Sequence, residues 1–252
     1  MPLRFVTDSG PRGILDANVD GVPVEMLVHA NAGFTVMVTH EALHRVTGRT
    51  VEKETEFGLG HDLQVSPRGR GSTTLRSLEV GGVELTDVPC AVFDLPTTNW
   101  EGMLGVDWIA ATQPVVDFGV RGLSFARVVP DGERLELTLD QSLGRYVTEI
   151  AVDGTSATFV LNAVADTTLD LAFAQSRGYD LLEETGVEHG PAGAVVPVHR
   201  TARPVSLGPL GAHQLLVHDT YAYRGAERPA DGVAGFIGAD LLLATRAVID
   251  FG

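Results

Sequence analysis

The segment Gly102-Met103-Leu104-Gly105-Val106-Asp107-Trp108-Ile109 occurs a second time, in altered form, as Gly235-Phe236-Ile237-Gly238-Ala239-Asp240-Leu241-Leu242. The copies are 133 residues apart, and each places a glycine between a short apolar run and an Asp. Each copy of such a repeat is expected to fold into a similar unit, so a repeat decides the architecture. The sequence therefore predicts a duplicated fold.

The same offset of 133 residues holds for other parts of the chain. Coincidental matches would not keep one offset over roughly a hundred residues. We therefore predict two homologous lobes, residues 1–129 and residues 130–252. The further matching segments are Val19-Asp20-Gly21 with Val152-Asp153-Gly154, and Val115-Val116-Asp117-Phe118-Gly119 with Val248-Ile249-Asp250-Phe251-Gly252.

Short runs rich in Val, Leu and Thr, separated by Gly, Pro and Asp, predict strands within each lobe. One short helix is expected near residues 39–46, with Thr39 as its N-cap and Gly48 as its terminator, and a second after Gly105. A lobe of this kind is mainly β with short helices. The strands predicted in the first lobe are 22–28, 35–38, 75–80, 88–93 and 115–118.

The composition limits the class of partner. The chain has 252 residues, of which 44% are hydrophobic, which is enough for one large core or two modest ones. Lys and Arg number 18 against 33 Asp and Glu, so the net charge is −15. Such a field repels phosphate backbones and anionic lipids. We therefore expect neither a nucleic acid nor a membrane as a partner.

Cysteine content and hydropathy indicate the compartment. Cys90 is the single cysteine, lies in the apolar run 88–93, and is expected to be a buried small hydrophobic residue. The N-terminal residues lack the apolar run of a signal peptide, and no apolar stretch reaches the roughly 18 residues of a membrane-spanning helix. The sequence predicts a cytoplasmic protein, and we expect it to be a monomer.

The repeated segments resemble the pepsin-like and retropepsin-like aspartic proteases. Each lobe of that family has an apolar strand followed by an Asp-Thr-Gly triplet, and later an apolar-apolar-Gly segment that opens a helix. The second signature is complete in both copies, as Met103-Leu104-Gly105 and Phe236-Ile237-Gly238. The resemblance extends over nearly the whole chain. It implies a mainly β fold of two pseudo-symmetric lobes with an interlobe cleft.

The first signature is intact in neither copy. His29 occupies the position of the family's catalytic Asp in the first lobe, and Asn162, at the same offset, occupies it in the second. Aspartic proteolysis needs two carboxylates that share one proton. An Asn side chain does not titrate, and an unperturbed His titrates near pH 6.5, about two units above a carboxylate. We therefore predict that the chain has no aspartic protease activity.

Two other segments spell a fragment of the missing triplet. Asp166-Thr167-Thr168 would restore a carboxylate, but only by shifting the repeat by four residues. Thr7-Asp8-Ser9-Gly10 is followed by Pro11 and lacks the preceding strand pattern, so it is interpreted as a turn. Neither segment changes the prediction.

The segment His40-Glu41-Ala42-Leu43-His44 matches the zinc motif H-E-x-x-H, in which two histidines on one helical face bind zinc. A longer form of the motif needs Gly at position 47 and His at position 50, where this chain has Thr47 and Thr50. We interpret the segment as an outer amphipathic helix with solvated histidines. No metal site is predicted, and a zinc hydrolase remains an alternative.

The resemblance implies that His29 and Asn162 lie side by side on the floor of the interlobe cleft. They are the candidate catalytic residues, and Asn31 and Asp166 are candidate ligand-binding residues close by. A small molecule or an extended ligand is the expected occupant, and no cofactor is expected.

Loops from each lobe are expected to cover this cleft. The candidates are residues 59–74 in the first lobe and residues 190–203 in the second, both rich in Gly and Pro. Arg68 and Arg70, near the tip of the first loop, are candidate contacts for an anionic ligand; the alternative is ordinary exposed loop charge.

Three classes of function remain open. The first is a non-proteolytic enzyme, such as a cyclase, isomerase or lyase of secondary metabolism. In that enzyme His29 is the general acid or base, and Asn162 or Asn31 donates to a developing oxyanion. The second is a pseudoprotease that binds a peptide or partner protein without reaction. The third is a structural module whose lobes have lost any chemistry.

Overall fold

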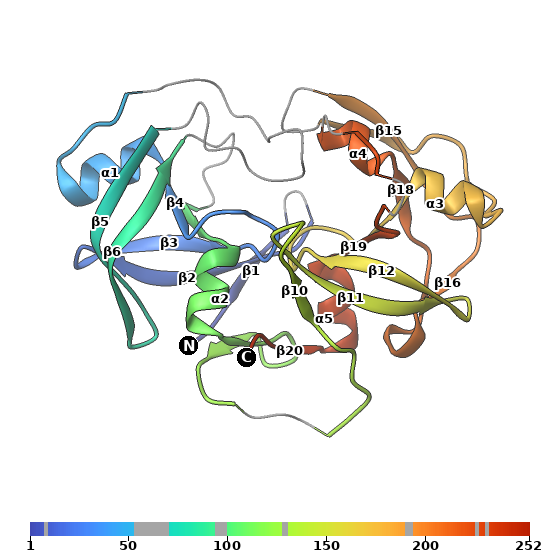
Figure 1. Ribbon diagram of the computed structural model, residues 1–252, viewed down its shortest axis with the longest axis horizontal. Helices are drawn as coiled ribbons and strands as arrows, with labels where there is room; N and C mark the ends of the chain where they lie inside the picture. Colours follow the sequence, from blue (N-terminus) through green and yellow to red (C-terminus); the bar gives the residue numbers. More distant parts are fainter. Residues whose placement is uncertain are drawn as a thin grey trace.

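The computed structural model describes residues 1–7, 10–52, 71–93, 100–127, 131–189, 194–224, 227–229 and 232–252. The chain is mainly β, and its two halves lie side by side, each built around its own sheet (Figure 1). The predicted boundary at residues 129 and 130 falls outside the described residues. No helix in the described ranges is long and apolar enough to cross a membrane.

The first lobe contains a seven-stranded sheet in the order β1-β2-β3-β7-β4-β6-β5, in which β2 also pairs with β5. Its elements are β1 (Arg4–Val6), β2 (Arg12–Val19), β3 (Val22–Val28), β4 (Val36–Val38), α1 (His40–Thr47), β5 (Gly71–Val80), β6 (Val83–Val92), β7 (Gly102–Leu104) and α2 (Val106–Thr112).

The second lobe contains an eight-stranded sheet in the order β10-β11-β12-β19-β13-β18-β15-β14. Its elements are β10 (Thr138–Asp140), β11 (Arg145–Val152), β12 (Thr155–Leu161), β13 (Thr168–Asp170), α3 (Leu171–Ser176), β14 (Gly186–His189), β15 (Val195–Arg200), β16 (Val205–Ser206), the 3-10 helix η1 (Gly208–Leu210), β17 (Ala212–His213), β18 (Leu216–His218), α4 (Thr220–Arg224), β19 (Gly235–Ile237) and α5 (Ala239–Thr245).

A three-stranded sheet joins the two lobes. It consists of β20 (Val248–Asp250), β8 (Val115–Asp117) and β9 (Gly122–Ser124), with β8 in the middle. The strands β8 and β20 pair antiparallel, and Val116 lies opposite Ile249, which is its own counterpart in the repeat. A strand that pairs with its own copy in this way lies on a pseudo-twofold axis. The repeat in the sequence is therefore a repeat in space.

Local signals in the sequence predicted several elements correctly. Strand β3 has the predicted bounds, and α1 begins after Thr39, whose side-chain oxygen accepts a hydrogen bond from the Ala42 N–H. The helix ends at Gly48, which has a left-handed φ of 68°. That conformation favours glycine because it has no Cβ. Helix α2 follows Gly105, as expected.

The strand β5 corrects the predicted extent of the first covering loop. Residues 71–74 belong to β5, where Gly71 pairs with Val92 and Thr73 with Cys90. The β6 strand also begins five residues before the predicted start at residue 88. The reason is the Gly81-Gly82 turn, with φ values of 57° and 84°, which folds β5 and β6 into one long hairpin. In the second lobe, residues 195–200 of the other candidate loop form β15, which pairs with β14.

The core runs through both lobes. One hydrophobic cluster contains Leu104 and Trp108 from the first lobe together with Ile237 and Leu242 from the second. Cys90 is buried, as predicted. Apolar burial of this extent supplies most of the stabilisation of such a fold.

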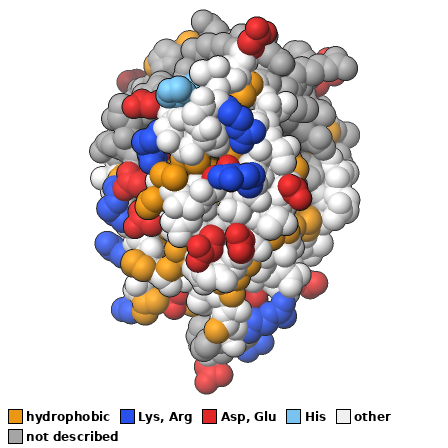
Figure 2. Space-filling model, turned by 90° about the vertical axis from the view of Figure 1, so that its left-hand side faces the viewer, with side chains coloured by type: hydrophobic (Ala, Val, Ile, Leu, Met, Phe, Trp, Pro, Cys, Tyr) orange, Lys and Arg blue, Asp and Glu red, His pale blue; other side chains and the backbone are white. Residues whose placement is uncertain are grey.

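The outer flank of the first lobe has a mixed surface. Figure 2 shows Lys and Arg, Asp and Glu, and hydrophobic side chains interspersed on the described part of this face rather than gathered in one continuous patch.

Candidate functional site

His29 and Asn162 occupy equivalent places in the two lobes. Each is the first residue after a strand that pairs in parallel with a later strand, Val28 with Leu104 and Leu161 with Ile237. The N–H of His29 donates to Leu104 O at 2.9 Å, and the N–H of Asn162 donates to Ile237 O at 2.9 Å. The loops that begin at these residues therefore start in the same geometry.

A directed chain of side-chain hydrogen bonds connects the two loops. The Nε of Arg145 donates to Asn31 Oδ1 at 2.6 Å, and the Nδ2 of Asn31 donates to Asn162 Oδ1 at 3.3 Å. The Nδ2 of Asn162 then donates to Val164 O at 2.9 Å. Asn31 and Arg145 are buried. A buried guanidinium polarises the amide that it binds, so the Asn31 amide is a stronger donor toward Asn162.

His29 lies against the same chain of contacts. Its Nδ1 accepts a hydrogen bond from the backbone N–H of Asn31 at 3.3 Å, and its side chain is half-buried. An imidazole nitrogen that accepts a hydrogen bond carries no proton, so the neutral ring has its proton on Nε2. The predicted residues His29, Asn31 and Asn162 are thus linked through Asn31.

The predicted residue Asp166 sits at the other end of the second loop, where the first lobe packs on it. The N–H of Ala165 donates to Pro11 O at 2.7 Å, and a Cβ on Gly10 would lie 2.8 Å from Ala165 Cα. Burial raises the pKa of Asp166 above its usual range, and the charge of Asp240 adds to this, while Arg200 and Arg12 oppose it. Asp166 therefore takes up a proton more readily than an exposed Asp.

Arg12 and Arg145 are counterparts in the repeat and face the loop of the opposite lobe. The charge of Arg12 opposes the rise in the pKa of Asp166, which lies in the second lobe. The counterpart of Asp166 in the first lobe is Gly33, where a Cβ would lie 2.9 Å from Arg145 Nη1. The guanidinium of Arg145 therefore occupies the space that a side chain at position 33 would fill. The Nε of Arg145 donates to Asn31, since Gly33 offers no carboxylate.

The second loop also holds strained backbone. Ala163 and Ala165 have φ values of 57° and 56°, in the left-handed region. Such conformations cost about 1 kcal/mol or more for a residue with a Cβ, and they persist only where the surroundings impose them. Here the N–H of Ala163 is bonded to Ile237 O at 3.2 Å. The fold thus holds the loop after Asn162 in one imposed shape.

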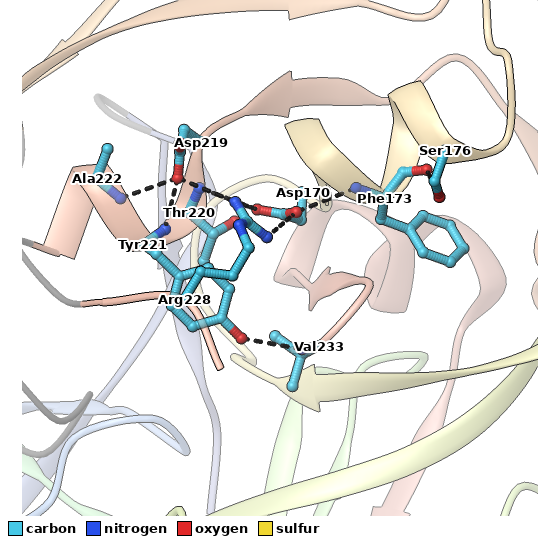
Figure 3. A network of polar contacts seen from close by, with 9 residues as sticks. All are labelled: Asp170, Phe173, Ser176, Asp219, Thr220, Tyr221, Ala222, Arg228 and Val233. Atoms are coloured by element: carbon cyan, nitrogen blue, oxygen red, sulfur yellow. Dashed lines mark hydrogen bonds and ion pairs between the residues drawn. The ribbon is translucent and has the colours of Figure 1, made fainter. Parts of the chain in front are cut away.

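A polar network anchors another segment of the second lobe (Figure 3). The fully buried Asp170 pairs with Arg228, which also contacts Asp219 at 3.1 Å and lies over the Tyr221 ring at 4.6 Å from its centroid. The Tyr221 hydroxyl accepts a hydrogen bond from the Val233 N–H at 2.9 Å. Arg228 is therefore held against the body of the lobe.

Other predicted features are not part of this arrangement. Arg68, Arg70 and most of the first covering loop fall within residues 53–70, outside the described residues. Helix α1, with His40 and His44, lies at the outer edge of the first lobe, on the side away from the second lobe (Figure 1). Within the described ranges, no three His, Cys, Asp or Glu side chains are grouped so that they could hold a metal ion.

Sequence reasoning missed Arg12 and Arg145. The signal was present, because the two arginines stand at the repeat offset and each opens a strand that precedes its lobe's loop. Their contacts with the opposite lobe follow from the pseudo-twofold axis and could have been inferred from it.

Comparison with known proteins agrees with this architecture. Residues 15–108, which include His29, match the family model for aspartyl proteases. No curated protein sequence matches the chain.

Solved structures give the more extensive match. An aspartic proteinase from Irpex lacteus is 11% identical, covers 92% of this chain and 89% of its own, and has a TM-score of 0.53. A retropepsin-like aspartic protease from Rickettsia conorii is 16% identical over 40% of this chain and 70% of its own, with a TM-score of 0.31. The retroviral protease-like domain of Ddi1 from Leishmania major is 12% identical over 46% of this chain and 88% of its own, with a TM-score of 0.32. The first of these likenesses extends over both lobes, so the chain has the two-lobed aspartic-protease fold.

Proposed function

We propose that this protein is a non-proteolytic enzyme that binds a small or extended ligand between its lobes and uses His29 for acid-base chemistry. Cyclisation, isomerisation and elimination are the reaction types that suit it, because none of them needs two carboxylates. The observation that carries the proposal is the bond between Asn31 and Asn162 across the lobes, with His29 hydrogen-bonded to Asn31.

The roles follow from the donors and acceptors present. Nε2 is the atom through which His29 exchanges a proton with the ligand, because Nδ1 is occupied by the Asn31 N–H. The amides of Asn31 and Asn162 are neutral, and the donor strength of Asn31 is raised by Arg145. Such amides stabilise a developing oxyanion without adding a charge of their own.

We expect no peptide hydrolysis at any pH from acid to neutral. A water molecule must be activated by one carboxylate while another acid donates to the scissile carbonyl, and positions 29 and 162 carry an imidazole and an amide. Casein and a mixed peptide library are the substrates, with an active aspartic protease as the positive control. Cleavage that pepstatin inhibits would contradict the expectation.

Substitution of His29 tests the enzymatic role. The protein is incubated with a library of small molecules that cyclise, isomerise or eliminate under acid-base catalysis, and products are followed by mass spectrometry. His29→Ala is expected to lower turnover by about 100-fold or more, the usual contribution of a general acid or base. The melting temperature should change little, because the side chain is only half-buried.

His44→Ala is the matched control, since it removes an exposed histidine from α1. Its turnover is expected to equal that of the wild type. Wild-type turnover in His29→Ala would remove His29 from the proposed role. Retention of a peptide without its conversion would favour the pseudoprotease instead.

A further inference from the structure

The first lobe contains a cavity of about 550 Å³. Its walls are residues 33–35 of the loop after β3, residues 71–74 of β5, residues 89–91 of β6, and Asp107 of α2. All of these residues belong to the first lobe. The volume falls in the range of small-molecule sites, about 300–1,000 Å³.

The sheet contributes hydroxyl groups to this cavity. Ser72 pairs with Ala91 and Thr74 with Pro89 in the β5–β6 ladder. Directly paired residues share a face, and alternate residues of a strand point the same way, so these four side chains lie on one face. The two hydroxyl-bearing residues, Ser72 and Thr74, are exposed.

Asp107 is the charged residue of the described wall. Its counterpart in the second lobe is Asp240, whose carboxylate has hydrogen-bond partners within that lobe. The carboxylate of that counterpart, Asp240, accepts hydrogen bonds from the N–H and the Oγ1 of Thr167, at 2.8 and 2.7 Å. At the position of Thr167 the first lobe has Phe34, which has no hydroxyl and whose N–H donates to Ala32 O at 2.9 Å. Asp107 is exposed and, among the described residues, its carboxylate accepts no hydrogen bond.

We propose that this cavity binds a small hydroxylated organic cation whose ammonium group contacts Asp107. The ammonium supplies the two donors that Thr167 supplies to Asp240 in the other lobe, and the hydroxyls meet Ser72 and Thr74. The net charge of −15 favours a cation over an anion. Arg49 donates to Thr73 Oγ1 and Thr74 O, both at 3.2 Å, and the Thr73 side chain points to the opposite face of β5 from Ser72 and Thr74.

Glucosamine and glucose are the probes, because they differ mainly in the ammonium group. Binding is measured by calorimetry and by amide chemical shifts in the labelled full chain. Glucosamine is expected to bind saturably and to shift the amide resonances of residues 71–74 and 107. The affinity for glucose should be lower by about tenfold or more, as for a lost charged hydrogen bond. Equal binding of the two sugars, or no saturable binding of glucosamine, overturns the proposal.

Two variants locate the site. Asp107→Asn should weaken glucosamine binding about tenfold or more, whereas Asp180→Asn, which removes an exposed carboxylate from the second lobe, should leave it unchanged. Ser72→Trp should abolish binding by filling the cavity from an exposed position. Unchanged binding in Asp107→Asn and Ser72→Trp overturns the assignment.

This test is independent of the proposed enzymatic function. His29→Ala should bind glucosamine as the wild type does, because His29 is not part of the cavity wall. Loss of turnover in His29→Ala with normal glucosamine binding supports both proposals, and normal turnover with normal glucosamine binding removes the enzymatic role alone.

Discussion

Asp170→Ala is expected to lower the free energy of unfolding by about 3 kcal/mol, the lower end of the cost of breaking a buried ion pair from one side, because Arg228 is partly exposed. The carboxylate of Asp170 is completely buried. It accepts hydrogen bonds from the N–H groups of Phe173 at 3.2 Å and Thr220 at 3.3 Å, and it pairs with both terminal nitrogens of Arg228. Alanine leaves all of these donors without their shared acceptor (Figure 3).

Thr39→Ala is the matched control for this substitution. Thr39 precedes α1 as Asp170 precedes α3, and the N–H of each donates to an equivalent carbonyl, Glu101 O at 2.9 Å and Ala234 O at 2.8 Å. Thr39 caps its helix without an ion pair, so Thr39→Ala should cost about 1 kcal/mol.

Urea unfolding at neutral pH measures both losses. Equal losses would mean that Arg228 contributes nothing beyond the cap. If Asp170→Ala does not fold, Asp170→Asn replaces it in the comparison, because the amide keeps the shape and the cap but not the charge. The loss in the free energy of unfolding of Asp170→Asn should then exceed that of Thr39→Ala. A loss no larger than that of Thr39→Ala would contradict the ion-pair argument.

The architecture could be predicted because it depends on features that recur at one offset. The apolar-apolar-Gly segments end in Gly105 and Gly238, and the strand segments at Val116 and Ile249 pair with one another, as an exact repeat about an axis requires. Helix α1 was predictable for a different reason. Its cap Thr39 and its terminator Gly48 act through the local backbone, within a few residues.

The contacts that distinguish the lobes could not be predicted in the same way. The Arg145–Asn31 bond joins residues 114 positions apart, and the Arg228–Asp170 pair joins residues 58 positions apart. Neither has a counterpart at the repeat offset, since Val164 stands at the position of Asn31 and Met37 at that of Asp170. Thr39, which occupies the place of Asp170 in the fold, has no carboxylate. Polar contacts of this kind depend on which side chain fills the space, which a pattern of apolar residues does not specify.

Substitution of the two motif glycines is expected to cost about 3 kcal/mol or more each, at or above the upper end of overpacking. A Cβ on Gly105 would lie 2.1 Å from Phe34 O and 2.5 Å from Ala32 O. A Cβ on Gly238 would lie 2.4 Å from Asp166 C and 2.6 Å from Ala165 O. These contacts are with backbone, which cannot move aside as a flexible side chain does.

The cause of this cost is collision and not dihedral strain. The φ values are −99° for Gly105 and −90° for Gly238, which residues with a Cβ adopt freely. Gly186→Ala is the control, because a Cβ there meets nothing within 4 Å. It should unfold as the wild type does, within about 0.5 kcal/mol.

Each glycine lies under the loop that carries one of the two central residues, Gly105 under the loop of His29 and Gly238 under that of Asn162. Because the loops meet through Asn31, displacing either one should lengthen the bond between Asn31 and Asn162. Gly105→Ala and Gly238→Ala should therefore also shift the side-chain amide resonances of Asn31 and Asn162 in the folded fraction, while Gly186→Ala leaves them in place. Stability equal to the wild type in Gly105→Ala would mean that the helix start does not support the loop as closely as the backbone contacts indicate.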